Sequence, residues 1–193
     1  MNPFFRSALV LLAALALSVR PAPGGELQAA ARKQALKVLK ALDSIQAESL
    51  SSKSPALRRS DFSEEEFNAY VAYRIDEEKE DVLRDLKLKL FGGNRVEGMA
   101  IIDLRRQNLP SFIKPRMNFY FEGVLVIQDG KGRFDFRKLF LEGQEVPVIV
   151  LDMIIDIAAR MGKSDAASIR AWADLPYGIK DLKTREGGIS LFY

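Results

Sequence analysis

The chain has 193 residues, of which 48% are hydrophobic and 28% are charged, and this composition is typical of a globular protein with its own core. Histidine and cysteine are both absent, which excludes imidazole and thiolate metal sites, thiol nucleophiles, Ser-His-Asp triads and disulfide bonds. The formal net charge of +3 is too small to indicate a surface for nucleic acid, so we expect no nucleic-acid partner. We also expect no metal and no cofactor.

Residues 1–25 are predicted to be a signal peptide for export. Arg6 precedes an apolar run of twelve residues at 8–19, and a segment with proline and glycine follows the run. Such a run is too short to span a hydrocarbon layer of about 30 Å, but it suits the central part of a signal peptide. We therefore expect a periplasmic or secreted protein, with an uncleaved anchor and a buried N-terminal helix as the alternatives.

Residues 26–50 are predicted to form an amphipathic helix, because apolar side chains recur at helical spacing while basic side chains occupy the other faces. The apolar positions are Ala31, Ala35, Val38, Leu42 and Ile45. A polar segment then leads to residue 60 and is interpreted as a linker.

A second helix is predicted from Ser63 to about Arg74. Ser63 is followed three residues later by Glu66, which is the pattern of a capping box. Phe62 before the cap and Phe67 after it are the pair expected of a hydrophobic staple. Acidic residues fill the first turn, where the helix dipole favours negative charge, so the start of this helix is specified locally.

From residue 82 onward, apolar and polar residues alternate with a period of two, which predicts β-strands. Turn sequences at 92–94, 129–132 and 185–188 join these strands as hairpins, so the sheet is predicted to be antiparallel. The alternation slips near Lys138, which predicts a β-bulge.

A long helix is predicted between the strands, with Pro147 in its first turn and Gly162 after its end. The order of elements predicts an α+β domain at 61–193, with about six antiparallel strands whose apolar face wraps on helices. The strand and helix positions expected to face inward are Leu86, Leu88, Leu90, Val96, Ile102, Phe119, Phe121, Leu125, Ile127, Phe134, Phe136, Leu151 and Ile155.

Two carboxylates of the long helix, Asp152 and Asp156, lie four residues apart and could serve as general acid and base. Arg160 lies four residues beyond Asp156, however, so a solvated polar stripe with a helical ion pair explains the same residues. We therefore interpret these carboxylates as surface residues.

The loop at 105–116 mixes apolar and basic side chains, which suits a loop that docks on an anionic membrane surface. The alternative is that its apolar residues fold under as a lid on the core. The residues concerned are Arg105, Arg106, Leu109, Phe112, Ile113, Lys114 and Arg116.

Three segments carry a resemblance to a known family. The helix start FSEEEFNAYV, the hairpin LKLFGGNRVEGMAIIDL and the closing hairpin LPYGIKDLKTREGGISLFY resemble those of LmeA-like phospholipid-binding proteins of the bacterial envelope. This group belongs with the wider AsmA-like and tubular lipid-binding (TULIP) proteins, and the resemblance covers about residues 60–193. The helix at 26–50 is not part of it.

The resemblance implies a strongly curved antiparallel sheet around one long helix, with an apolar groove for acyl chains and no catalytic residues. It implies that the inward-facing residues named above contact a lipid or another hydrophobic ligand, and that Asn68 has a structural role. An envelope scaffold or interaction module with a filled core is the alternative, in which the helix at 26–50 would bind a protein partner.

Overall fold

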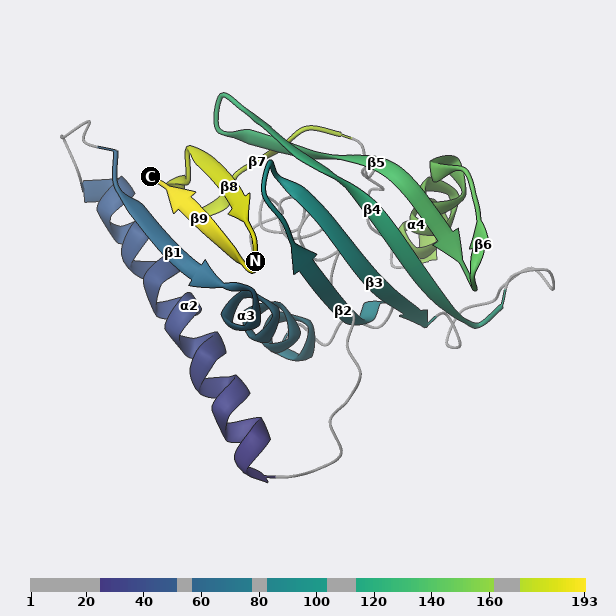
Figure 1. Ribbon diagram of the computed structural model, residues 1–193, viewed down its shortest axis with the longest axis horizontal. Coiled ribbons are helices and arrows are strands. Elements are labelled where there is room, and N and C mark those ends of the chain that lie inside the picture. The colour runs from purple at the N-terminus through teal and green to yellow at the C-terminus, as the bar shows by residue number, and fades with distance from the viewer. Residues whose placement is uncertain (1–24, 52–56, 78–82, 104–113, 162–170) are drawn as a thin grey trace.

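The computed structural model describes residues 25–51, 57–77, 83–103, 114–161 and 171–193 (Figure 1). The helices of this part of the chain are α2 (Gly25–Ser51), α3 (Glu64–Glu77) and α4 (Val148–Met161). The strands are β1 (Arg59–Ser63), β2 (Leu83–Leu90), β3 (Arg95–Asp103), β4 (Arg116–Gln128), β5 (Lys131–Leu141), β6 (Gln144–Glu145), β7 (Ala173–Asp174), β8 (Asp181–Arg185) and β9 (Gly188–Phe192), with a 3-10 turn, η1, at Pro176–Gly178.

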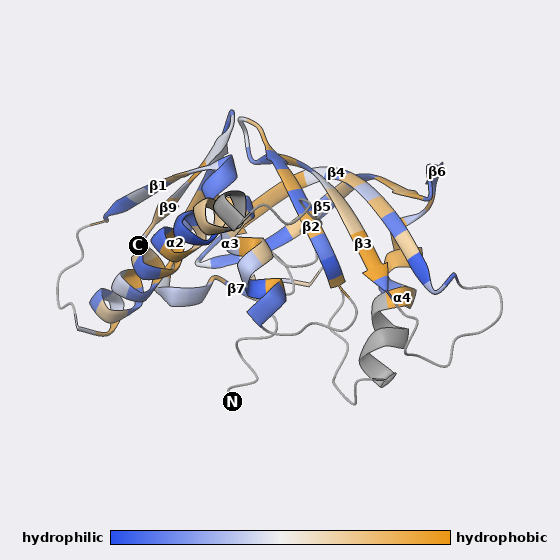
Figure 2. Ribbon diagram, turned by 90° about the horizontal axis from the view of Figure 1, so that it is seen from below, coloured by the Kyte–Doolittle hydropathy of each residue, from blue (hydrophilic) through white to orange (hydrophobic). Residues whose placement is uncertain are grey.

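The larger sheet has the order β2-β3-β4-β5-β6, and β7 pairs with the far end of β5. Every pairing in it is antiparallel, and the long strands curl strongly into a half-barrel (Figure 2). The α+β class, the antiparallel hairpins and the strong curvature expected for this chain are therefore confirmed.

A smaller sheet has the order β1-β9-β8 and lies beside α2 (Figure 1). The closing hairpin predicted from its turn sequence supplies β8 and β9. The third strand, β1, comes from a segment that was expected to end a linker, and it pairs with β9 from Arg59 opposite Phe192 to Ser63 opposite Gly188. Its sequence, RSDFS, does not alternate as a half-buried strand would, and only Phe62 is buried.

The hairpin turns follow from residues that tolerate positive φ. Asp129 and Gly130 join β4 to β5 with φ values of 50° and 71°, which is the two-residue turn that matches the twist of paired strands. Farther along the hairpin, Glu122 is opposite Lys138 but Gly123 is opposite Phe136, so Arg137 is the extra residue of a bulge. The bulge predicted near Lys138 is confirmed.

The predicted capping box at the start of α3 is also confirmed. The Glu66 backbone N–H donates to Ser63 Oγ at 3.1 Å, and the Ser63 backbone N–H donates to Glu66 Oε2 at 3.0 Å. Phe62 and Phe67, the expected staple pair, are both buried in the core. The helix ends at Glu77, three residues beyond the predicted end at Arg74.

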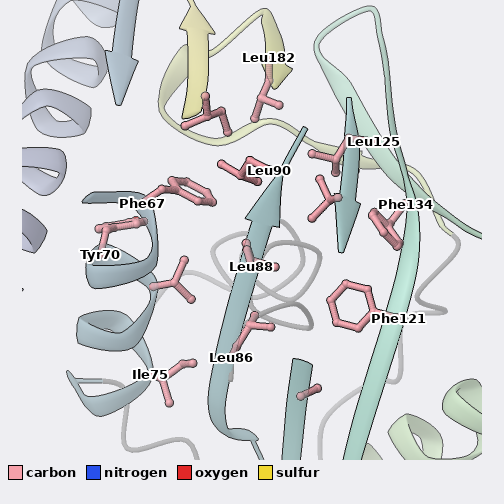
Figure 3. Packing of buried hydrophobic residues seen from close by; sticks show 14 of the residues in the cluster. Phe67, Tyr70, Ile75, Leu86, Leu88, Leu90, Phe121, Leu125, Phe134 and Leu182 are labelled. Atoms are coloured by element: carbon pink, nitrogen blue, oxygen red, sulfur yellow. The ribbon is translucent and has the colours of Figure 1, made fainter. Parts of the chain in front are cut away.

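One apolar core joins the helices to both sheets. In Figure 3, Leu86, Leu88 and Leu90 of β2 stand between the α3 side chains and the rings of Phe121 and Phe134. The predicted stripe of α2 contributes Ala35, Val38, Leu42 and Ile45, whereas Ala31 is exposed. In the described part of the chain, no helix combines the length and the apolar character needed to cross a membrane.

Candidate functional site

The apolar inner face of the half-barrel is the candidate binding face, and the predicted contact residues converge on it. Because successive strand residues point to opposite faces, β2 buries Leu86, Leu88 and Leu90 while Lys87 and Lys89 stay exposed on the outer face. The buried members of the predicted set are Leu86, Leu88, Leu90, Val96, Ile102, Phe119, Phe121, Leu125, Phe134 and Leu151. Ile127 and Phe136 are half-buried against the same core, and the side chain of Ile155 lies outside the described residues.

Three phenylalanines from β4 and β5 form an edge-to-face cluster in the middle of this face. The ring centroid of Phe121 lies 5.7 Å from that of Phe134 and 5.9 Å from that of Phe136. The centroids of Phe134 and Phe136 are 4.6 Å apart. Such tilted arrangements are favoured because the positive edge of one ring meets the negative face of another. The three rings form an apolar cluster in the centre of the sheet.

Two strand glycines make room for these rings. A Cβ on Gly98 would overlap the Phe121 ring, and a Cβ on Gly123 would overlap the Phe134 ring and the backbone of Asp135. Gly98 is directly opposite Phe121 in the register of β3 and β4, and the end of the Phe121 ring occupies the space that a side chain at position 98 would need. Sequence analysis singled out the neighbouring phenylalanines, but it did not connect them with the glycines that lie beneath them.

Within the residues that the structure describes, the inner face is incompletely covered where β5, β6 and α4 meet. Leu141, Val146, Val148 and Val150 are only partly buried against the core there. On the same helix, Ile149 and Met153 are 53% and 54% exposed, while Leu151 and Ile154 are buried. We call these residues (Leu141, Val146, Val148, Ile149, Val150 and Met153) the β5–α4 corner. It is an apolar surface continuous with the core.

The opposite side of the face is closed by α3, which covers the edge of β2. Asn68 Nδ2 donates to the carbonyl of Leu88 at 2.8 Å, and the Leu88 N–H donates to Asn68 Oδ1 at 2.8 Å. The Leu90 N–H donates to Glu64 Oε2 at 2.7 Å, and its carbonyl accepts from the Gly187 N–H at 3.0 Å. Side chains and a turn thus take the place of a neighbouring strand, which protects an edge that could otherwise pair with another chain.

The outer face of the half-barrel is polar, with ion pairs between and along the strands. Lys138 Nζ lies 3.3 Å from Glu122 Oε2, and Arg95 pairs with Glu97. Burial raises the pKa of Tyr120 on this face, and its hydrogen bond with Glu97 raises it further, so the phenol stays neutral. The sheet therefore separates a charged outer surface from an apolar inner one.

The predicted docking loop is only partly within the described residues. Lys114 and Arg116 are exposed at the start of β4, and Arg105, Arg106, Leu109, Phe112 and Ile113 lie outside the described part. Of the two helix carboxylates, Asp152 is half-buried, and the side chain of Asp156 also lies outside it.

The chemistry that this arrangement offers is the exclusion of water from apolar groups. Its inner surface consists of aliphatic and aromatic side chains, and the polar groups near it are engaged in holding the strands. Comparison of the chain with protein-family models, with curated proteins and with solved structures found no match in any of the three.

Proposed function

We propose that this chain is an exported, non-enzymatic protein that binds a lipid or another hydrophobic ligand in the bacterial cell envelope. The observation that carries the proposal is the β5–α4 corner, where the core is continuous with exposed apolar surface. An acyl chain entering there would meet Phe136 and the half-buried valines before it reached the fully buried residues.

The energetics of such binding need no polar chemistry. Each methylene group transferred from water into an apolar site contributes about 0.8 kcal/mol, so an acyl chain with several buried methylenes reaches useful affinity. The resemblance to LmeA-like proteins, carried by the start of α3 and by the β2–β3 and β8–β9 hairpins, supports the same ligand class. The signal-like residues 1–25 support an envelope location.

A scaffold or interaction module without a ligand is the second candidate. It is favoured by the tight packing of several predicted contact residues, since Phe119, Phe121 and Phe134 are each at most 1% exposed. Residues so deeply buried can simply fill the core. The two candidates differ in what they require of the β5–α4 corner, which has a ligand-binding role only in the first.

The test is a fluorescent fatty-acid binding titration with two matched variants. The first combines Ile149→Gln with Met153→Gln on α4, and the control combines Leu50→Gln near the end of α2 with Leu57→Gln shortly after it. All four residues are exposed, and α2 and α4 lie at opposite ends of the molecule (Figure 1). Removing two apolar contacts from an acyl site should weaken probe binding by about tenfold.

The control variant should bind the probe as the unmodified protein does. Palmitate should compete with the probe for both of these proteins. Equal losses in the two variants would show that the corner is not the entrance. A folded protein that takes up no probe at all would favour the scaffold.

A further inference from the structure

The solvent-facing side of α2 carries basic residues around one exposed leucine. Arg32, Lys33 and Lys40 are exposed, and Leu36, which lies between them on the same side, is 44% exposed. The opposite side of the helix carries Val38, Leu42 and Ile45 into the core. We call Arg32, Lys33, Leu36 and Lys40 the α2 basic face.

The charge of this face is not neutralised by its surroundings. Lys37, at its border, is paired with Glu66 of α3, but Arg32, Lys33 and Lys40 form no ion pair with any side chain that the structure describes. The sequence places no acidic residue between positions 27 and 42. On the sheets, some basic residues are matched by neighbouring carboxylates, as in Arg133 with Asp135 and Lys138 with Glu122.

We propose that the α2 basic face rests on the anionic surface of a phospholipid bilayer. Each Lys or Arg held near such a surface is attracted to it, and long basic side chains can reach lipid phosphates while their stems lie on apolar groups. Leu36 is placed to enter the interfacial layer between them. The charge complementarity is between these cations and lipid headgroups.

The chain order supports this occupant over an acidic protein. Only five residues, Arg20 to Gly24, separate the apolar run at 8–19 from the first residue of α2. In the precursor, or in a chain that keeps the run as an uncleaved anchor, the bilayer that engages the run would therefore lie next to the start of α2. The β5–α4 corner is at the other end of the molecule and stays free, so the inference does not rest on ligand binding there (Figure 1).

The experiment is vesicle co-sedimentation of the chain as it is purified from cells that process it naturally. Vesicles of phosphatidylglycerol mixed with phosphatidylcholine are compared with vesicles of phosphatidylcholine alone. A variant with Arg32→Gln, Lys33→Gln and Lys40→Gln should bind the anionic vesicles about a hundredfold more weakly, at about fivefold for each charge removed. The affinity of the unmodified chain should fall as salt is added.

The matched control combines Lys87→Gln, Arg137→Gln and Lys180→Gln, which removes the same charge from exposed positions on β2, on β5 and just before β8. It should keep most of the affinity for anionic vesicles, and Leu36→Ser alone should show an intermediate loss. Circular dichroism should show that all variants remain folded, since every substituted side chain is exposed.

Equal losses in the two triple variants would mean that only net charge matters, and the inference would be overturned. Binding to neutral vesicles that matches binding to anionic ones would overturn it as well. So would failure of the unmodified chain to bind anionic vesicles, which would leave α2 as a surface for a protein partner.

Discussion

Gly98 shows how single residues set the shape of the inner face. Because it has no side chain, the Phe121 ring can lie directly on the backbone of β3 and pack against Phe134 and Phe136. Gly98→Ala should destabilise the fold by about 1–3 kcal/mol, since the new methyl group forces the fully buried ring aside. Urea denaturation measures the change.

Gly92→Ala is the control, because a Cβ there meets nothing within 4 Å, and its effect should stay within about 0.5 kcal/mol. The double variant Gly98→Ala with Phe121→Leu should be less destabilised than the sum of its single changes, because the smaller side chain leaves room for the methyl group. Strict additivity would mean that the ring and the glycine are not coupled.

Asn68 is a second single residue that shapes the sheet, because its side chain bonds the edge of β2 where a neighbouring strand would otherwise pair. Both of its hydrogen bonds to the Leu88 backbone are lost in Asn68→Ala, which leaves a partly buried N–H and C=O without their partner. The expected loss of stability is about 1–3 kcal/mol. Asn68→Asp should lose at least as much, because a carboxylate oxygen would then face the Leu88 carbonyl. Asn118→Ala, at an exposed position on β4, should change stability little.

At the scale of elements, Glu66 joins α2 to α3. Hydrogen bonds from Lys37 and from the Ser63 backbone lower its pKa from the ordinary value of 4.5. Folding therefore favours the ionised form, so its contribution is complete above pH 4.5 and is lost as the pH falls through the lowered pKa.

The variant Glu66→Gln tests this linkage, because glutamine keeps an acceptor for the capping box but carries no charge. The unmodified protein should be the more stable of the two at neutral pH, and the difference should shrink steadily in acid. Denaturant midpoints of both proteins, recorded from neutral to acidic pH, would reveal this change in the stability difference. A difference that does not depend on pH would contradict the role of the charge.

Elements with local signals were predictable from the sequence. The capping box of α3, the Asp129–Gly130 turn and the bulge beside Lys138 each depend on neighbours along the chain, and all three are present. Strand β1 was missed because it exists through pairing with β9 at the other end of the chain, which no local pattern in RSDFS announces. The division of the strands between two sheets is likewise set by long-range contacts, such as the bond from Gly187 to Leu90.

The candidate site was predictable to the extent that it follows strand alternation. Inward positions such as Leu88 and Phe121 were identified because every second residue of a half-buried strand faces the core. The β5–α4 corner was not predictable, because α4 is apolar around much of its circumference and its sequence does not indicate which apolar residues remain exposed. Only the packed structure shows that Leu151 and Ile154 are buried while Ile149 and Met153 are exposed.

At the scale of the whole molecule, the half-barrel has one side closed by α3 and another left partly open at the β5–α4 corner. This asymmetry suits a protein that admits a hydrophobic ligand from one side while its edge strand is protected on the other. The outer face of the same sheet carries ion pairs, so its two faces differ in polarity.

Native mass spectrometry of the protein purified from its own envelope, without added detergent, tests the central claim most directly. We expect a population heavier than the polypeptide by the mass of a lipid, which organic extraction removes and lipid analysis identifies. The Ile149→Gln and Met153→Gln variant should carry less of it than the Leu50→Gln and Leu57→Gln control. A folded protein recovered with the bare polypeptide mass, and unable to take up lipid when it is offered, would contradict the account.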